Sequence, residues 1–172
     1  MQGRPARFRT PAETTWLRHG DAVVPQARIK EAYGEFAHRP AAGRSIEIDP
    51  RWVDGNIVTR TVPILGPVTC HRAVLGPLGE AMQDLVLANL AHLVDTGGFA
   101  GCWAPRRIAA GAPLSRHAWG VAVDLNIGAN PRGSFSTQDD RLVEVMARHG
   151  FGWGGTWLVP DPGHYEAVAL RP

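Results

Sequence analysis

The stretch Ser115–Asp124, with the sequence SRHAWGVAVD, is the part of the chain around which the rest is organised. His117 and Asp124 stand seven residues apart, and Gly120 between them lets the backbone turn. After this glycine, apolar residues alternate with small or polar ones, which predicts a strand with one apolar face, formed by Val121, Val123, Leu125 and Ile127. Asp124 then lies on the opposite face. An imidazole at the start of the strand and a carboxylate on its free face can converge on one cation.

A second stretch, Asp161–Glu166 (DPGHYE), completes the candidate site. His164 supplies a third donor, and three protein ligands with one open position are what a catalytic zinc site requires. Asp161 is the candidate general base for a metal-activated water. Taken singly, these residues have ordinary interpretations: a hydrogen-bonded histidine, a strand-end aspartate, and an Asp-Pro-Gly turn. Their combination indicates a zinc hydrolase.

The pattern S-x-H-x-x-G-x-A-x-D followed by D-x-x-H resembles a known peptidase family. Its members are the VanY-like zinc D-alanyl-D-alanine carboxypeptidases and L-alanyl-D-glutamate endopeptidases, which cut peptidoglycan stem peptides. The resemblance runs from about Cys102 to Glu166 and extends more weakly back to about Pro25. It implies Zn2+ as cofactor, Asp161 as general base, and three zinc ligands: His117, Asp124 and His164. The sequence does not decide between carboxypeptidase and endopeptidase, because that depends on how closed the cleft is beyond the metal.

The family also places an arginine before the first motif, to hold a substrate carboxylate. Arg106 and Arg107 are both candidates, and Pro105-Arg106-x-Ile108 matches the family form best, so Arg106 is expected to bind substrate. Guanidinium binds a carboxylate in a bidentate manner, which lysine cannot do. An exposed basic pair on a loop is the alternative interpretation.

Four further residues are candidates for supporting roles. Ser115 is a candidate to bind substrate or orient His117, with a plain turn serine as the alternative. Trp153 and Trp157 lie in the glycine-rich stretch GFGWGGTW and are candidates to pack on substrate, although tryptophans are more commonly core residues. Glu166 follows His164 by two residues and is a candidate to fix the ring nitrogen that the metal does not use.

The zinc peptidase interpretation implies a small α+β fold, which suits the helical runs and short strands of the hydrophobic pattern. The clearest helix is expected over residues 77–95, with Pro77 in its first turn, and another over 137–149, capped by Thr137. Residues 24–36 show a weaker helical stripe. Residues 45–48 and 56–65 are expected to be extended, within a β-rich lobe (45–72) over the site. The expected architecture is a small antiparallel sheet carrying the zinc site, with helices packed on one face.

The two cysteines, Cys70 and Cys102, lack the C-x-x-C spacing of a structural zinc site. The resemblance implies that they form a disulfide, because family members with a similar leader region often carry the same pair. Two buried free thiols are the alternative.

Length and composition suit one soluble globular domain. The chain has 172 residues, of which 44% are hydrophobic and 20% charged, and we expect an N-terminal arm (1–22) and a single catalytic domain (23–172). A net charge of +2 is too small to indicate a nucleic-acid partner, and no apolar run is long enough to span a membrane. A monomer is expected.

No signal peptide is visible in the basic N-terminus, which has no apolar h-region. The resemblance nevertheless implies an extracytoplasmic or secreted enzyme at the cell wall, exported by a route that the sequence does not reveal. Two other function classes are alternatives. The first is a non-catalytic, zinc-containing wall-binding module, against which the intact Asp161 argues. The second is a zinc hydrolase of some other small peptide or amide, which a substrate panel would distinguish.

Overall fold

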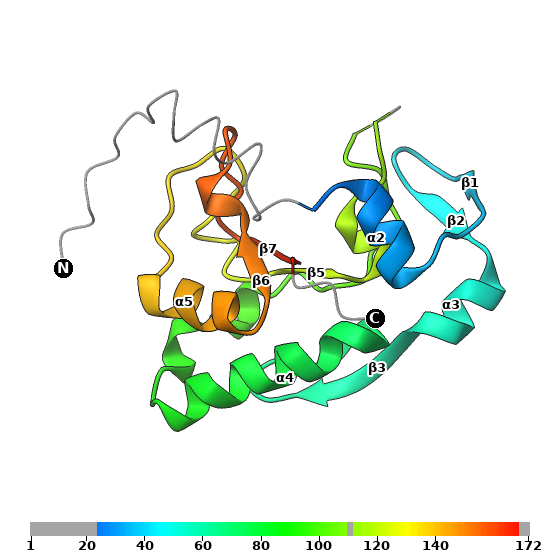
Figure 1. The fold of residues 1–172 in the computed structure, drawn as a ribbon. Coiled ribbons are helices and arrows are strands. Elements are labelled where there is room, and N and C mark those ends of the chain that lie inside the picture. Colours follow the sequence, from blue (N-terminus) through cyan, green and yellow to red (C-terminus); the bar gives the residue numbers. More distant parts are fainter. Residues whose placement is uncertain (1–23, 110–111, 169–172) are drawn as a thin grey trace.

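A computed structural model describes residues 24–109 and 112–168 of the chain (Figure 1). The fold is mixed α+β, as predicted. The helices are α2 (Gln26–Tyr33), α3 (Pro50–Asn56), α4 (Arg72–Leu87) and α5 (Asp140–Arg148), with 3-10 turns η1 (Ala91–Leu93), η2 (Thr96–Gly98), η3 (Arg116–Trp119) and η4 (Gly154–Thr156). The strands are β1 (His38–Pro40), β2 (Ile46–Ile48), β3 (Ile57–Val62), β4 (Gly66–His71), β5 (Ala122–Asp124), β6 (Phe151–Trp153) and β7 (His164–Ala167). The predicted arm, residues 1–22, lies outside the described residues.

Three strands form the central sheet, in the order β5-β7-β6, with both pairings antiparallel. Val123 lies opposite Tyr165, and both side chains are fully buried in the core. Because successive residues of a strand point to opposite faces, the neighbouring pair Asp124 and His164 lies on the other face. Helix α5 contacts both α4 and β6 and covers the apolar face (Figure 1). The predicted mixed α+β class with a small antiparallel sheet is therefore confirmed.

The remaining strands form two antiparallel pairs, β1–β2 and β3–β4. The extended segments predicted at 45–48 and 56–65 correspond to β2 and β3. Between them, Asp49 caps the short helix α3, which the sequence analysis did not anticipate, by accepting a hydrogen bond from the backbone of Arg51. The predicted lobe (45–72) therefore contains strands, but the residues that line the candidate site come from other segments.

Helix α4 begins five residues earlier than predicted. The His71 side chain caps it, because its Nδ1 accepts a hydrogen bond from the backbone N–H of Ala73 at 3.2 Å. Pro77 consequently lies inside the helix and not in its first turn. The prediction relied on the preference of proline for the first turn, and it missed a histidine cap placed upstream.

Helix α4 also ends earlier, at Leu87, where the prediction continued to Asp95. Asn89 adopts a left-handed conformation (φ 58°) just beyond the helix. The N–H of Leu90 then bonds to the carbonyl of Leu85 at 2.7 Å, and the N–H of Asn89 to that of Val86 at 3.1 Å. This is the Schellman pattern of a helix terminus, formed here by asparagine in place of glycine.

The second predicted helix is present as α5, but its cap differs. Asp139, and not Thr137, accepts the hydrogen bond from the backbone of Arg141 at 2.9 Å. Thr137 instead donates its backbone N–H to the side chain of the buried Asn130. Of the apolar residues predicted to face inward, Leu142, Val145 and Met146 are buried, and Val143 is partly buried against the core.

Gly120 meets two requirements at the turn into β5. It adopts φ 68°, and a Cβ at this position would stand 2.7 Å from the backbone nitrogen of His71. That nitrogen donates a hydrogen bond to the Gly120 carbonyl at 2.9 Å. Only glycine allows the turn and the close approach of β4 together.

Next to this contact, Cys70 and Cys102 form a disulfide, with their Cα atoms 5.4 Å apart. The disulfide is therefore confirmed and the free-thiol alternative is wrong. It joins the end of β4 to the segment that precedes the first site motif. In the part of the chain that the structure describes, no helix combines the length and hydrophobicity needed to cross a bilayer.

Reduction of this disulfide should lower the melting temperature. The crosslink closes a loop of about 31 residues, for which the chain-entropy model gives roughly 3–4 kcal/mol of unfolding free energy. The measurement is thermal unfolding with and without reductant, and a Cys70→Ser/Cys102→Ser double variant is the control that reductant should not affect. Two titratable thiols in denatured, unreduced protein made under oxidising conditions would contradict the assignment.

Candidate active site

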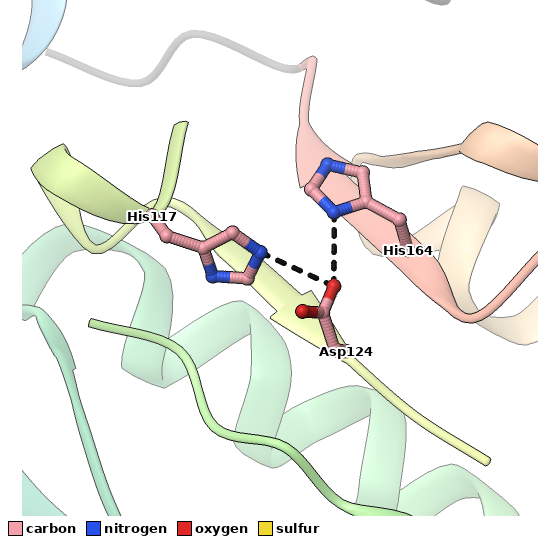
Figure 2. A group of neighbouring side chains, drawn as sticks. All are labelled: His117, Asp124 and His164. Carbon is pink, nitrogen blue, oxygen red and sulfur yellow. Dashed lines mark hydrogen bonds and ion pairs between the residues drawn. The ribbon is translucent and has the colours of Figure 1, made fainter. Parts of the chain in front are cut away.

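Three side chains that are distant in the sequence converge on the polar face of the central sheet (Figure 2). They are His117, Asp124 and His164, and their potential ligand atoms all lie within 4.8 Å of one another. His117 Nε2 is 3.1 Å from Asp124 Oδ1, and His164 Nδ1 is 2.9 Å from the same oxygen. The structure thus brings together the three predicted ligands.

Each ligand is held by a different local element. Asp124 ends β5 and His164 begins β7, and the two are register partners across the antiparallel pair. His117 lies in the turn η3, where Ser115 accepts a hydrogen bond from the backbone N–H of His117 at 3.3 Å. Ser115 therefore supports the turn that presents His117, which is one of the roles considered for it. Substrate binding by Ser115 stays a prediction.

Hydrogen bonds fix the orientation of both imidazole rings. His117 Nδ1 donates to the carbonyl of Cys102 at 2.7 Å, which leaves Nε2 as the ring nitrogen that faces Asp124. His164 Nε2 donates to Glu166 Oε2 at 3.2 Å and leaves Nδ1 facing Asp124. Metal-binding histidines usually have the second nitrogen anchored in this way. The donor set of two imidazoles and one carboxylate therefore fits a divalent cation, and Glu166 occupies the predicted supporting position.

The charges of the group also suit a cation. Burial raises the pKa of Asp124, but hydrogen bonds with His117 and His164 outweigh it and hold that pKa well below its usual range. Burial lowers the pKa of His164, but hydrogen bonds to Asp124 and Glu166 outweigh it and raise the pKa to about 9. Without a metal, a proton on His164 offsets one of the two neighbouring carboxylate charges. A bound cation would take the place of that proton.

Glu166 is itself paired with an arginine that the sequence analysis did not select. The side chains of Glu166 and Arg116 are only 4% and 14% exposed, and Arg116 Nε lies 3.8 Å from Glu166 Oε1. Arg116 also donates to the backbone carbonyl of Val24. This pairing places a positive charge beside the buried carboxylate that anchors His164. No sequence pattern indicates this ion pair, because Arg116 precedes the first residue of the His-Asp-His group in the sequence and Glu166 follows the last.

The His-Asp-His group opens into a cavity of about 430 Å³. Asp161 lines this cavity and is half-buried, and burial is the main reason that its pKa is raised. Arg106 also lines it, with a guanidinium nitrogen 3.8 Å from Asp124 Oδ2. Trp157 contributes an aromatic wall, with its ring centroid 5.2 Å from that of His164. Arg132, which the sequence analysis did not select, lines the cavity as well.

Trp153 is not among the residues that line this cavity. It is the register partner of Tyr165 in the β6–β7 pair, which puts it on the apolar side of the sheet. Its indole N–H donates to the carbonyl of Pro162 at 2.8 Å. Of the two tryptophans considered for substrate contact, Trp157 is therefore the one whose position suits it.

An α+β domain with a buried His-Asp-His group and a carboxylate in the same cavity has the design of a metal-dependent hydrolase. The family model described as D-alanyl-D-alanine carboxypeptidase matches residues 109–167. This segment contains all three residues of the group and Asp161. The match confirms the resemblance to this peptidase family over these residues. Neither the curated proteins nor the solved structures contain a match to the chain.

The division between metal ligands and base can be tested by metal content. Asp124→Asn should weaken metal binding by more than the ~10–100-fold typical of losing an outer partner, because it removes a charged ligand. Asp161→Asn is the matched control, since it should leave the three donors intact. Elemental analysis of both purified variants beside the unmodified protein measures this. Metal lost from Asp161→Asn but retained by Asp124→Asn would invert the assignment.

Proposed function

We propose that this protein is a zinc peptidase that hydrolyses peptide bonds in peptidoglycan stem peptides. The observation that carries the proposal is the convergence of His117, Asp124 and His164 in a cavity that also contains Asp161 and Arg106. Two neutral imidazoles, one carboxylate and an open side toward a cavity are the donor set of catalytic zinc sites. The family match supports peptide hydrolysis as the chemistry.

Zinc, when bound, supplies a Lewis acid that polarises the scissile carbonyl and acidifies water. The remaining chemistry falls to residues of this chain. Asp161 accepts the proton of the attacking water and returns it to the leaving amine. The burial that raises the Asp161 pKa makes it a stronger base than an exposed aspartate.

Arg106 is the proposed carboxylate-binding residue of the substrate site. Its side chain is 26% exposed and lies at the edge of the His-Asp-His group. Burial and the neighbouring Arg44 lower its pKa, whereas Asp124 and Asp161 oppose that shift. The guanidinium therefore stays charged near neutral pH and can bind a substrate carboxylate beside the reacting bond.

We also propose that the enzyme acts outside the cytoplasm, at the cell wall, as a monomer. The Cys70–Cys102 disulfide supports this location, because disulfides persist in oxidising compartments. A monomer is consistent with a site whose ligands, base and arginine all come from one chain. A non-catalytic wall-binding module would have no use for a half-buried carboxylate in this cavity.

Digestion of purified peptidoglycan should release stem-peptide fragments, and mass spectrometry should identify the bond that is cut. Asp161→Asn should lose about 100-fold or more in kcat, which is the usual scale of general-base catalysis. Chelation should abolish turnover, and added zinc should restore it. Near-normal turnover of Asp161→Asn would move the role of base to another carboxylate, and no cleavage by zinc-loaded protein would reject the proposed function.

Arg106→Ala should reduce kcat/KM by the equivalent of roughly 2–4 kcal/mol, because it removes a carboxylate partner from a partly desolvated site. Arg107→Ala is the adjacent control and should leave kcat/KM unchanged on a minimal substrate that spans only the scissile bond. Steady-state kinetics on that substrate compares them. The opposite ranking would transfer the role to Arg107, and no effect from either would remove it.

A further inference from the structure

A second cavity of about 230 Å³ adjoins the metal cavity. The two share three lining residues, Gln26, Pro113 and Leu114. The Gln26 side chain donates to the carbonyl of Leu114 at 3.4 Å, so helix α2 and residues 112–114 meet at the boundary. A substrate chain that leaves the metal cavity across this boundary enters the second cavity directly.

The adjacent arginines serve the two cavities separately. Arg106 bridges to Ser45 and Arg107 bridges to Leu114, so the backbone is extended here. Successive side chains of an extended segment point to opposite sides. Accordingly, Arg106 lines the metal cavity and Arg107 lines the second one.

Arg107 brings an unneutralised positive charge to the second cavity. One of its terminal nitrogens donates to the carbonyl of Ala112 at 2.9 Å, and the other lies 3.4 Å from His38 Nε2. Among the described residues, no carboxylate forms an ion pair with it. The other two charged residues of the lining, Lys30 and Glu35, pair with each other. The net charge of the lining is therefore that of Arg107.

The second cavity also offers apolar surface. Phe36 and Trp119 contribute to its lining, and both are almost completely buried. The Trp119 indole N–H is bonded to the carbonyl of Gly34 at 2.9 Å, which fixes the ring. The cavity thus combines one arginine with a rigid aromatic wall.

We propose that this second cavity is a subsite for an acidic extension of the substrate, with Arg107 binding its carboxylate. The inference rests on the proposed function and makes it more specific. A peptide that fills only the metal cavity is bound by Arg106. A longer peptide passes Gln26 and Leu114 into the second cavity and is also bound by Arg107. The favoured substrate is then an extended peptide with a carboxylate some residues from the scissile bond, which is an endopeptidase type of selection.

The test compares three types of synthetic substrate with the same scissile bond. The first is minimal, the second adds a few residues that carry an acidic side chain, and the third carries the corresponding amide side chain in its place. Extensions are made on either side of the bond. For the unmodified enzyme, the acidic extension should lower KM relative to the other two substrates. Arg107→Gln should raise KM about tenfold for the acidic substrate and leave the other two unchanged, because it removes a charge-assisted hydrogen bond. Arg60→Gln, on the exposed part of β3, is the matched control.

Equal losses on all three substrates would show that Arg107 only holds its loop through Ala112, and would overturn the subsite. An unchanged KM for every substrate in Arg107→Gln would overturn the subsite as well. Calorimetric titration with a non-cleavable peptide bearing the acidic extension gives an independent measurement, because it needs no turnover. If the peptide binds more weakly to Arg107→Gln but not to Arg60→Gln, the subsite is supported even when no substrate is cleaved. Absence of cleavage would reject only the proposed function. Equal binding to all three proteins would reject the subsite alone.

Discussion

Asp124 and His164 are register partners in the antiparallel pairing of β5 with β7, although they are forty residues apart in the sequence. This pairing is the constraint on which the site depends. It brings a carboxylate and an imidazole to within 2.9 Å on the polar face, while Val123 and Tyr165 pack into the core on the other. A shift of one residue in the register would reverse both faces of β7, burying His164 and turning Tyr165 toward the cavity. Core packing and site geometry therefore select the same register.

The central features of the site could be predicted from sequence because they are encoded locally. The alternation after Gly120 fixes the face of Asp124, and D-x-x-H fixes the spacing of Asp161 and His164. The helix ends were less predictable, since a histidine cap at His71 and an asparagine terminus at Asn89 are less common than the residues on which the predictions relied.

Features that depend on contacts between distant segments could not be predicted. The pairing of Arg116 with Glu166 and with the Val24 carbonyl joins three parts of the chain, and no pattern of spacing marks it. The separation of Arg106 from Arg107 has the same origin: the dipeptide is visible in the sequence, but the two cavities arise from the way α2 packs beside residues 112–114. Trp153 is a further example, because only its pairing with Tyr165 assigns it to the apolar face.

Cys102 takes part both in the disulfide and in the hydrogen bond that orients His117. Its sulfur is bonded to that of Cys70, and its carbonyl oxygen accepts a hydrogen bond from His117 Nδ1–H. The covalent crosslink thus anchors the acceptor that sets the tautomer of the first ligand. Loss of the crosslink under reducing conditions would loosen the backbone that orients His117, so the redox state of Cys70 and Cys102 is coupled to the geometry of the His-Asp-His group.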